Sequence, residues 1–280
     1  MPNPVLTEAI DRVAGGEDLT ADEAARVLRE VMDGGASEVE TAALLIGLRA
    51  KGETVAEITG LARTMRELAV KVDAGIDDLV DTAGTGGGVP TFNVSTTAAL
   101  VAAGAGCHVA KHGNRSATSR CGSADVLEAL GARIDLEPEA VADCIRGFGF
   151  GFMFAPRHHQ AMRHVVPVRK ELGVRTIFNL LGPLTNPAGA RRQVIGVSDP
   201  AYLETLAAAL SQLGSEGALV DRSVLIDGPL CIRQRLLLRI DYLKAVLRRR
   251  GGCGGCAFFR PSNDVLHRRH RFGFGLPFRT

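Results

Sequence analysis

The chain has 280 residues, of which 46% are hydrophobic and 23% are charged, and its formal net charge is +2. This composition is typical of a globular protein with a sizeable core. Because no run of about eighteen apolar residues occurs and the N-terminus is acidic and polar, we expect neither a membrane span nor a secretory signal. Six cysteines without framework spacing favour reduced thiols and a cytoplasmic location.

Residues 1–72 are predicted to form a small helical domain. Three Ser/Thr-x-x-Glu patterns, which begin at Thr20, Ser37 and Thr54, are typical of helix N-termini, where hydroxyl and glutamate satisfy orphan N–H groups. Apolar residues follow each pattern at helical spacing. Nothing in this part carries chemistry, so we interpret it as a scaffold whose exposed apolar faces suit packing or dimerisation.

From about residue 78 short apolar runs alternate with helical patterns. This alternation predicts an α/β domain over residues 73–220 with a mostly parallel central sheet, and ligands of such sheets bind at the carboxyl ends of the strands. The predicted strands cover residues 79–84, 107–111, 150–155, 192–197 and 217–220. The predicted helices cover residues 95–104, 123–131, 138–146, 157–172 and 200–213.

The loops after the first two strands are rich in groups that bind anions. Gly84–Gly88 holds four glycines, so its backbone N–H groups can approach an anion, and Ser95 and Thr96 open the next helix at its positive end. The loop fits neither the Walker pattern nor G-x-G-x-x-G, which argues against an ATP or dinucleotide pocket. A tight turn with an N-cap is the alternative.

The second strand leads into Lys111–Arg115, which supplies two cations and an amide, and further hydroxyls follow at Ser116, Thr118, Ser119 and Ser123. Two anion-binding helix starts with cations between them would suit a ligand with several phosphates. Farther along the chain, Arg169 is a candidate partner for a carboxylate. The spacing of His158, His159 and His164 argues against a metal site.

Several of these stretches together resemble the anthranilate phosphoribosyltransferase family over residues 4–220. The stretches are DTAGTGGG, FNVSTTAAL, VAKHGNRSATS, GSADVLEALG, NLLGPLTNP and QVIGVSDP. The resemblance implies a helical N-terminal domain, a larger α/β domain and a homodimer through the helical part. It also implies transfer of a phosphoribosyl group from phosphoribosyl pyrophosphate to the amine of anthranilate, with release of pyrophosphate, in tryptophan biosynthesis.

Site residues follow from the same resemblance. Phosphoribosyl pyrophosphate would be bound by Gly84, Gly87, Gly88, Thr91, Asn93, Val94, Ser95, Thr96, Lys111, His112, Gly113, Asn114, Arg115, Ser116, Ala117, Thr118, Ser119 and Ser123. Anthranilate would be bound by Gly84, Asn114 and Arg169, with Arg169 on its carboxylate, and Ser95 would contact Mg²⁺. No side chain is assigned as acid, base or nucleophile, because the reaction depends on positioning and electrostatics.

Two departures from the family pattern bear on activity. The family's glycine loop ends in Asp where this chain has Gly88, and the Asp-Glu pair that binds magnesium in the family is not found after Val220. Residues 221–280 hold 13 Lys and Arg but 4 Asp and no Glu, whereas the preceding 220 residues hold 20 basic and 27 acidic residues. This switch favours an aberrant C-terminal part that arose from a frameshift in a GC-rich gene.

Three alternatives remain open at the level of sequence. The first is a nucleoside phosphorylase of the related fold. The second is a catalytically dead remnant, because an altered C-terminus is expected to impair turnover. The third is a zinc-binding tail at Cys253-x-x-Cys256 and His267-x-x-His270, although that spacing lies outside the usual finger pattern. We expect no nucleic-acid partner and no membrane.

Overall fold

The computed structural model describes residues 1–86, 92–116, 121–221 and, for the backbone only, 235–238. The chain divides into two compact units, Met1–Ile240 and Asp241–Thr280, and the second lies outside the described residues. Predictions for the basic tail, including the zinc pattern and the frameshift, therefore stay predictions. The domain boundaries predicted at residues 72 and 220 stay predictions as well.

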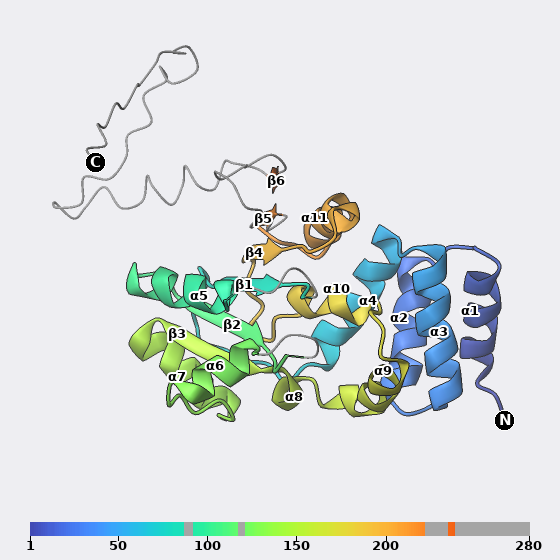
Figure 1. Cartoon of the computed structure of the whole chain (residues 1–280), viewed down its shortest axis with the longest axis horizontal. Coiled ribbons are helices and arrows are strands. Elements are labelled where there is room, and N and C mark those ends of the chain that lie inside the picture. The colour runs from blue at the N-terminus through green and yellow to red at the C-terminus, as the bar shows by residue number, and fades with distance from the viewer. Residues whose placement is uncertain (87–91, 117–120, 222–234, 239–280) are drawn as a thin grey trace, which may run out of the picture. The chain divides into compact units, whose positions relative to one another are not determined.

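Four helices form the N-terminal bundle (Figure 1): α1 (Pro4–Ala14), α2 (Ala21–Met32), α3 (Glu38–Lys51) and α4 (Val55–Leu68). All three predicted capping boxes are present, at Thr20, Ser37 and Thr54. In each, the third helical residue is a glutamate. The Ser or Thr hydroxyl accepts from the backbone N–H of this glutamate, and the glutamate carboxylate accepts from the backbone N–H of the Ser or Thr. α1 begins differently, because the Asn3 side chain accepts from the N–H groups of Val5 and Leu6.

The α/β part contains five parallel strands, as predicted: β1 (Val80–Gly84), β2 (Val109–Gly113), β3 (Phe150–Phe154), β4 (Arg192–Gly196) and β5 (Gly217–Asp221). Their order in the sheet is β3-β2-β1-β4-β5, and β6 (Arg235–Leu238) pairs antiparallel with β5. The sequence pattern did not predict the strand at β6. The fold class, a helical bundle followed by an α/β domain with a mostly parallel sheet, is confirmed.

The helices of this part are α5 (Val94–Gly104), α6 (Ser123–Ala129), α7 (Pro138–Phe148) and α11 (Leu203–Gln212). A short 3-10 turn, η3 (Pro200–Tyr202), precedes α11. The single helix predicted over 157–172 is wrong. The chain instead forms α8 (Ala155–His158), η1 (Gln160–His164) and α9 (Val166–Leu172), followed by α10 (Phe178–Leu181) and η2 (Gly182–Leu184). Pro156 and Pro167 each start a new helix because proline has no N–H to donate inside one.

One hydrophobic core runs through the bundle and half of the sheet. Leu6, Leu48 and Ile58 of the bundle belong to the same buried cluster as Ile195 of β4 and Val220 of β5. Polar contacts reinforce this packing, since the Arg66 guanidinium donates to the carbonyls of Leu184 and Leu213 at 2.6 and 2.9 Å. The β2 and β3 side of the sheet has two smaller clusters of its own.

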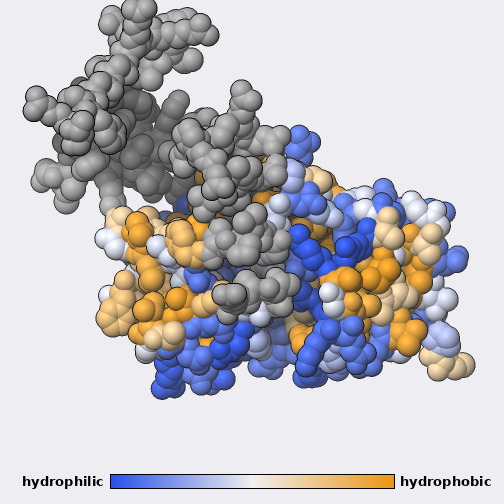
Figure 2. All heavy atoms as spheres, viewed as in Figure 1, coloured by the Kyte–Doolittle hydropathy of each residue, from blue (hydrophilic) through white to orange (hydrophobic). Residues whose placement is uncertain are grey.

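Some apolar side chains stay exposed on helices and on the sheet. Val39 and Ile46 lie on α3, Leu100 and Val101 lie on α5, and Val194 is 42% exposed although β4 lies between two other strands. Figure 2 shows apolar side chains gathered over α3 and over α5. None of the helices in the described ranges combines the length and the apolar character that a membrane crossing requires.

The tightest backbone approach in the bundle is at Gly60 of α4. A Cβ added there would lie 2.0 Å from the carbonyl oxygen of Ala21, at the start of α2. We expect Gly60→Ala to force the helices apart and to lower the free energy of unfolding by about 3 kcal/mol. Urea unfolding followed by circular dichroism would measure the change.

The matched control for this prediction is Gly147→Ala in α7, where an added Cβ meets nothing within 4 Å. Because alanine restricts the unfolded chain more than glycine does, this variant should keep or raise stability by roughly 0.5 kcal/mol. Equal effects of the two substitutions would contradict the close approach of α2 and α4.

Candidate active site

The N-terminus of α5 faces a network of hydroxyl groups. The Ser95 hydroxyl accepts from the Lys111 ammonium at 3.3 Å, and the Ser95 carbonyl accepts from the Thr82 hydroxyl at 2.7 Å. Thr96 is buried and donates to the Ser123 hydroxyl at 2.9 Å. The predicted helix start after β1 is confirmed, and its N–H groups and positive dipole end make it a place where an anion is stabilised.

Lys111 is the buried cation of this site. Lys111 belongs to β2 and is only 1% exposed, so its side chain is buried in the protein. Its ammonium also donates to the Thr82 carbonyl at 2.6 Å. Burial lowers the pKa of Lys111, and the negative charge of Asp81 opposes that change. Because the ammonium lies in a medium that screens charge weakly, its attraction for a phosphate is stronger than that of an exposed lysine.

Asp81 is a buried carboxylate that the sequence analysis missed. One of its oxygens accepts from the His112 N–H at 3.2 Å, and the other accepts from the Asn186 amide at 2.8 Å. Burial raises its pKa, while Lys111 and the hydrogen bond from Asn186 lower it. An acidic residue inside the short apolar run LVDTAG was the available signal, since aspartate is rarely buried without a partner.

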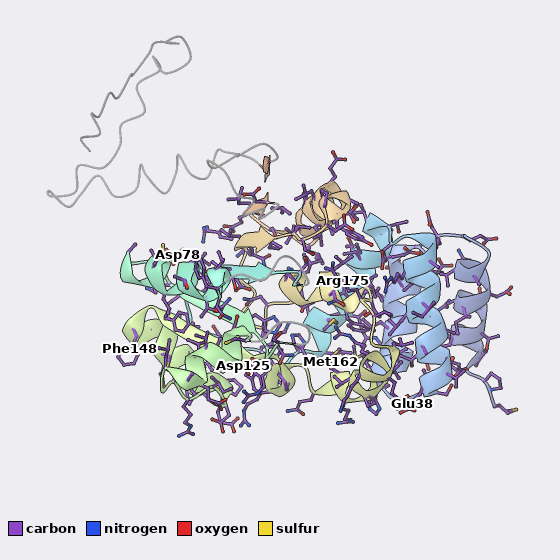
Figure 3. All side chains as sticks on the ribbon, in the orientation of Figure 1. Glu38, Asp78, Asp125, Phe148, Met162 and Arg175 are labelled. Atoms are coloured by element: carbon purple, nitrogen blue, oxygen red, sulfur yellow. The ribbon has the colours of Figure 1, made fainter. Side chains whose placement is uncertain are left out.

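The loop after β2 is held by its own acidic residues. Arg115 donates to Asp125 and Glu128, each at 2.8 Å, and Asp125 also accepts from the N–H groups of Ser116 and Gly122. Figure 3 labels Asp125 at α6. The second predicted anion-binding helix start is therefore occupied by a carboxylate of the chain itself, so Lys111 differs from Arg115 in having no acidic group within ion-pair distance among the described residues.

The other predicted residues of this loop lie close by. The side-chain oxygen of Asn114 accepts from the Arg115 N–H at 2.7 Å, and its backbone carbonyl accepts from the Ala124 N–H. Gly113 ends β2 where an added Cβ would lie 2.9 Å from the Phe152 ring and 3.1 Å from Ser123. This close contact explains why the chain uses glycine between the strand and the loop.

Three histidines are buried in the same domain as Lys111, and one of them, His112, follows it in β2. The rings of His112 and His159 are 5.0 Å apart, and each donates to a backbone carbonyl, that of Gly182 or of Thr185. Burial lowers the pKa of both rings, to about 4 for His159. His158 donates to the Val70 carbonyl, and burial lowers its pKa as well. These contacts make the three rings neutral parts of the core.

Arg169 of α9 is a largely buried guanidinium that lies 5.4 Å from the centre of the Phe178 ring. Burial lowers its pKa, and within the described residues its guanidinium forms neither an ion pair nor a side-chain hydrogen bond. A desolvated guanidinium without an acidic partner favours a carboxylate from outside the chain, because two parallel N–H groups match its two oxygens.

The remaining predicted residues fall into two groups. Gly84 ends β1, Val94 begins α5, and Asn93 precedes α5 and donates to the Cys121 carbonyl at 3.1 Å. Gly87, Gly88, Thr91, Ala117, Thr118 and Ser119 lie outside the described residues. The structure thus brings Ser95, Thr96, Lys111 and Ser123 together at the carboxyl ends of β1 and β2.

A dedicated magnesium site does not fit the described residues. No group of three or more His, Cys, Asp or Glu side chains in those ranges could hold a metal ion, and Asp81 is committed to Asn186 and the His112 N–H. The hydroxyl of Ser95 is the candidate ligand that the sequence analysis named, and one neutral hydroxyl is far from the oxygen set that Mg²⁺ takes.

Comparison with known proteins agrees with this geometry. Residues 76–228 match the model of the "Glycosyl transferase family, a/b domain", and residues 7–69 match that of its "helical bundle domain". The structure is also similar to that of anthranilate phosphoribosyltransferase from Thermus thermophilus, with a TM-score of 0.75 and 48% identity over 82% of this chain and 72% of that chain. The chain belongs to the anthranilate phosphoribosyltransferase family. The resemblance predicted from the sequence is thereby confirmed.

Other members of the family are similar over the same part. The anthranilate phosphoribosyltransferase of Rubrobacter xylanophilus is 60% identical over 217 residues, which are 77% of this chain and 63% of that protein. The chain thus spans about 63% of the length of the curated relatives it matches. The Saccharomyces cerevisiae enzyme, solved in complex with PRPP and Mg, gives a TM-score of 0.70 at 28% identity, over 77% of this chain and 64% of that one.

The buried histidines predict a loss of stability in acid. An unfolded histidine binds a proton below pH 6.5, whereas folded His159 does so only near pH 4. The unfolded state therefore binds more protons in this window, and stability falls as the pH drops from about 6.5 to about 4. We expect each such histidine to add a slope of up to about 1.4 kcal/mol per pH unit.

Urea unfolding of the wild-type chain and of His159→Gln between pH 4 and pH 7.5 would measure this slope. The pH slope of the free energy of unfolding should be smaller in the variant by the contribution of one histidine. The variant should also be less stable than wild type at neutral pH, because the buried hydrogen bond of the His159 ring to the Thr185 carbonyl is altered. The half-exposed His108, which pairs with Asp78, provides the control His108→Gln. An unchanged slope in His159→Gln would show that this ring does not titrate in the window.

Proposed function

We propose that this chain binds phosphoribosyl pyrophosphate and anthranilate and transfers the phosphoribosyl group to the anthranilate amine. The observation that carries the proposal is the buried ammonium of Lys111, which meets the Ser95 hydroxyl at the N-terminus of α5. Within the part of the chain that the structure describes, no acidic group lies at ion-pair distance from Lys111, and a cation so placed beside orphan N–H groups is suited to a pyrophosphate. Membership in the family supports the reaction, because relatives with these elements are anthranilate phosphoribosyltransferases.

The proposed reaction exchanges one bond at the C1 carbon of the ribose. The bond from C1 to the pyrophosphate oxygen breaks, its electron pair leaves with the pyrophosphate, and the anthranilate nitrogen bonds to C1 and releases a proton. Negative charge builds on the leaving oxygen, where the α5 N-terminus and Lys111 would stabilise it. The protein's task is then to hold charge and geometry, so no acid or base side chain is required.

The proposed phosphoribosyl pyrophosphate site comprises the residues named from the family resemblance, including those in the two segments outside the described ranges. For anthranilate we propose that Arg169 binds the carboxylate while Gly84 and Asn114 line the remainder of the site. The guanidinium of Arg169, which lies over the Phe178 ring and has no acidic partner among the described residues, supports this assignment. An anthranilate-type ligand is further supported by the Saccharomyces cerevisiae relative, which was solved in complex with 4-fluoroanthranilate.

Magnesium enters the proposal only together with the substrate. Because the described residues lack a carboxylate cluster, we propose that Mg²⁺ arrives on the pyrophosphate and that the Ser95 hydroxyl is its contact on the chain. The structure of the Saccharomyces cerevisiae relative with PRPP and Mg supports such a pairing. Without the family's Asp-Glu pair, we expect slower turnover than in full-length relatives.

Loss of anthranilate fluorescence in the presence of phosphoribosyl pyrophosphate and Mg²⁺ would measure the activity. We expect slow turnover by the wild-type chain, and a KM for anthranilate at least about tenfold higher in Arg169→Met, because a charged hydrogen-bonded pair is lost. Arg163→Met is the matched control, since Arg163 is exposed and donates to His164. No fluorescence loss at high protein concentration would reject the proposed activity.

The chain is also proposed to form a homodimer through its helical bundle. Val39, Ala43, Ile46 and Ala50 recur at helical spacing along α3, and all four are exposed. A continuous exposed apolar stripe on a helix is typical of a contact surface. This support is independent of the active site.

Sedimentation velocity would test the proposed dimer. We expect the wild-type chain to sediment as a dimer at micromolar concentration and Ile46→Glu to sediment as a monomer, because a buried charge opposes association. Glu38→Gln, at the first residue of the same helix, serves as a control that leaves the stripe intact. A monomeric wild-type chain would rule out this interface.

A further inference from the structure

Arg175 connects three parts of the fold. It lies between α9 and α10, and its backbone carbonyl accepts from the guanidinium of Arg49, on α3 of the bundle, at 2.7 Å. Its own guanidinium donates through Nη2 to the carbonyl of Gly86 at 3.0 Å and to the hydroxyl of Ser198 at 2.8 Å. Figure 3 labels Arg175 near α10 and α4. One side chain thus bridges the loops that follow β1 and β4.

These two loops are linked to each other as well. The Thr85 hydroxyl accepts from the Ser198 N–H at 3.1 Å and lies 3.2 Å from the Ser198 hydroxyl, while the Thr85 N–H donates to the Gly196 carbonyl. Thr85 is buried and Arg175 is half-buried, so the bridge lies partly inside the protein. Hydrogen bonds from a guanidinium in such a place are stronger than those made at an exposed surface.

Gly86 is the residue at which this bridge meets the glycine loop. Its φ of +67° lies in the left-handed region that side chains disfavour, and nothing within 4 Å would contact a Cβ there. The requirement for glycine is therefore one of backbone direction. The hydrogen bond from Arg175 to the Gly86 carbonyl therefore restrains the backbone at the start of the loop proposed to bind phosphoribosyl pyrophosphate.

We propose that Arg175 is a positioning residue for the phosphoribosyl pyrophosphate site. It acts through Gly86 and Ser198, orienting the glycine loop before substrate binds, and Arg49 fixes the backbone from which it reaches. This inference rests on the proposed function for the identity of the ligand. A guanidinium nitrogen that donates to two loops has a different role from that of a solvated surface charge.

Two measurements on the full chain test the proposal. Hydrogen exchange of the peptide that spans residues 84–92 reports the loop without any ligand, and isothermal titration with phosphoribosyl pyrophosphate and Mg²⁺ reports binding. In Arg175→Met we expect loop exchange to rise several-fold and the Kd to rise about tenfold. Arg133→Met, which removes an exposed arginine paired with Asp135, should match wild type in both.

Ser198→Ala provides a second variant in case Arg175→Met fails to fold. It removes one acceptor of the bridge, so we expect the same changes in smaller size, and the double variant should be no worse than Arg175→Met alone. Additive effects would overturn the shared role. Unchanged loop exchange in both single variants would overturn it too, even with weakened binding, because Arg175 would then contact the ligand directly.

The outcomes also separate this proposal from the proposed function. If the wild-type chain fails to bind phosphoribosyl pyrophosphate while Arg175→Met speeds loop exchange, the function falls and the orienting role of Arg175 stands. If the wild-type chain binds and neither measurement changes in Arg175→Met, the role of Arg175 falls and the function stands.

Discussion

The parallel pairing of β1 with β4 is the constraint on which the site depends. The chain leaves β1 toward β2 and β3 and later returns on the other side of β1 as β4, so the direction in which strands are added to the sheet reverses at β1. Such a change of direction opens a crevice at the carboxyl ends of two adjacent strands. Gly84 and Gly196 are register partners at this point. The residues that follow them, Thr85 after β1 and Ser198 after β4, therefore lie side by side.

The charge of the site is built into the strands. Asp81 and Lys111 are interior residues of β1 and β2, and Asn186 donates both to the Asp81 carboxylate and to the Ala110 carbonyl beside Lys111. Burying two charges is costly, and the opposite charges of Asp81 and Lys111 offset part of that cost without an ion-pair contact. The exposed Arg115, by contrast, is paired with Asp125 and Glu128, whereas Lys111 meets no acidic group at ion-pair distance among the described residues.

Local patterns were predicted well because their causes are local. The capping boxes at Thr20, Ser37 and Thr54 and the apolar runs of the five strands depend on residues within a few positions of each other. The helix predicted over 157–172 failed because apolar spacing was followed past Pro167. Long-range contacts had no local signal: the partners Asp81 and Asn186 are 105 residues apart, and the Arg175 bridge to Gly86 spans 89.

The shared core bears on how cooperatively the molecule opens. The bundle, α10, β4 and β5 contribute to one buried cluster, whereas β2 and β3 are packed by two small ones. Leu79, which leads into β1, belongs to the same cluster as Ala110 of β2 and Met153 of β3, so the boundary between the cores runs inside the sheet, between β1 and β4. Partial unfolding would start on the side that carries the Lys111 strand and the loop after it, and would leave a native-like body made of the bundle with β4 and β5. The hydrogen bonds that join Thr85 and Gly86 to Ser198 and Arg175 cross this boundary, so they hold the two parts of the sheet together.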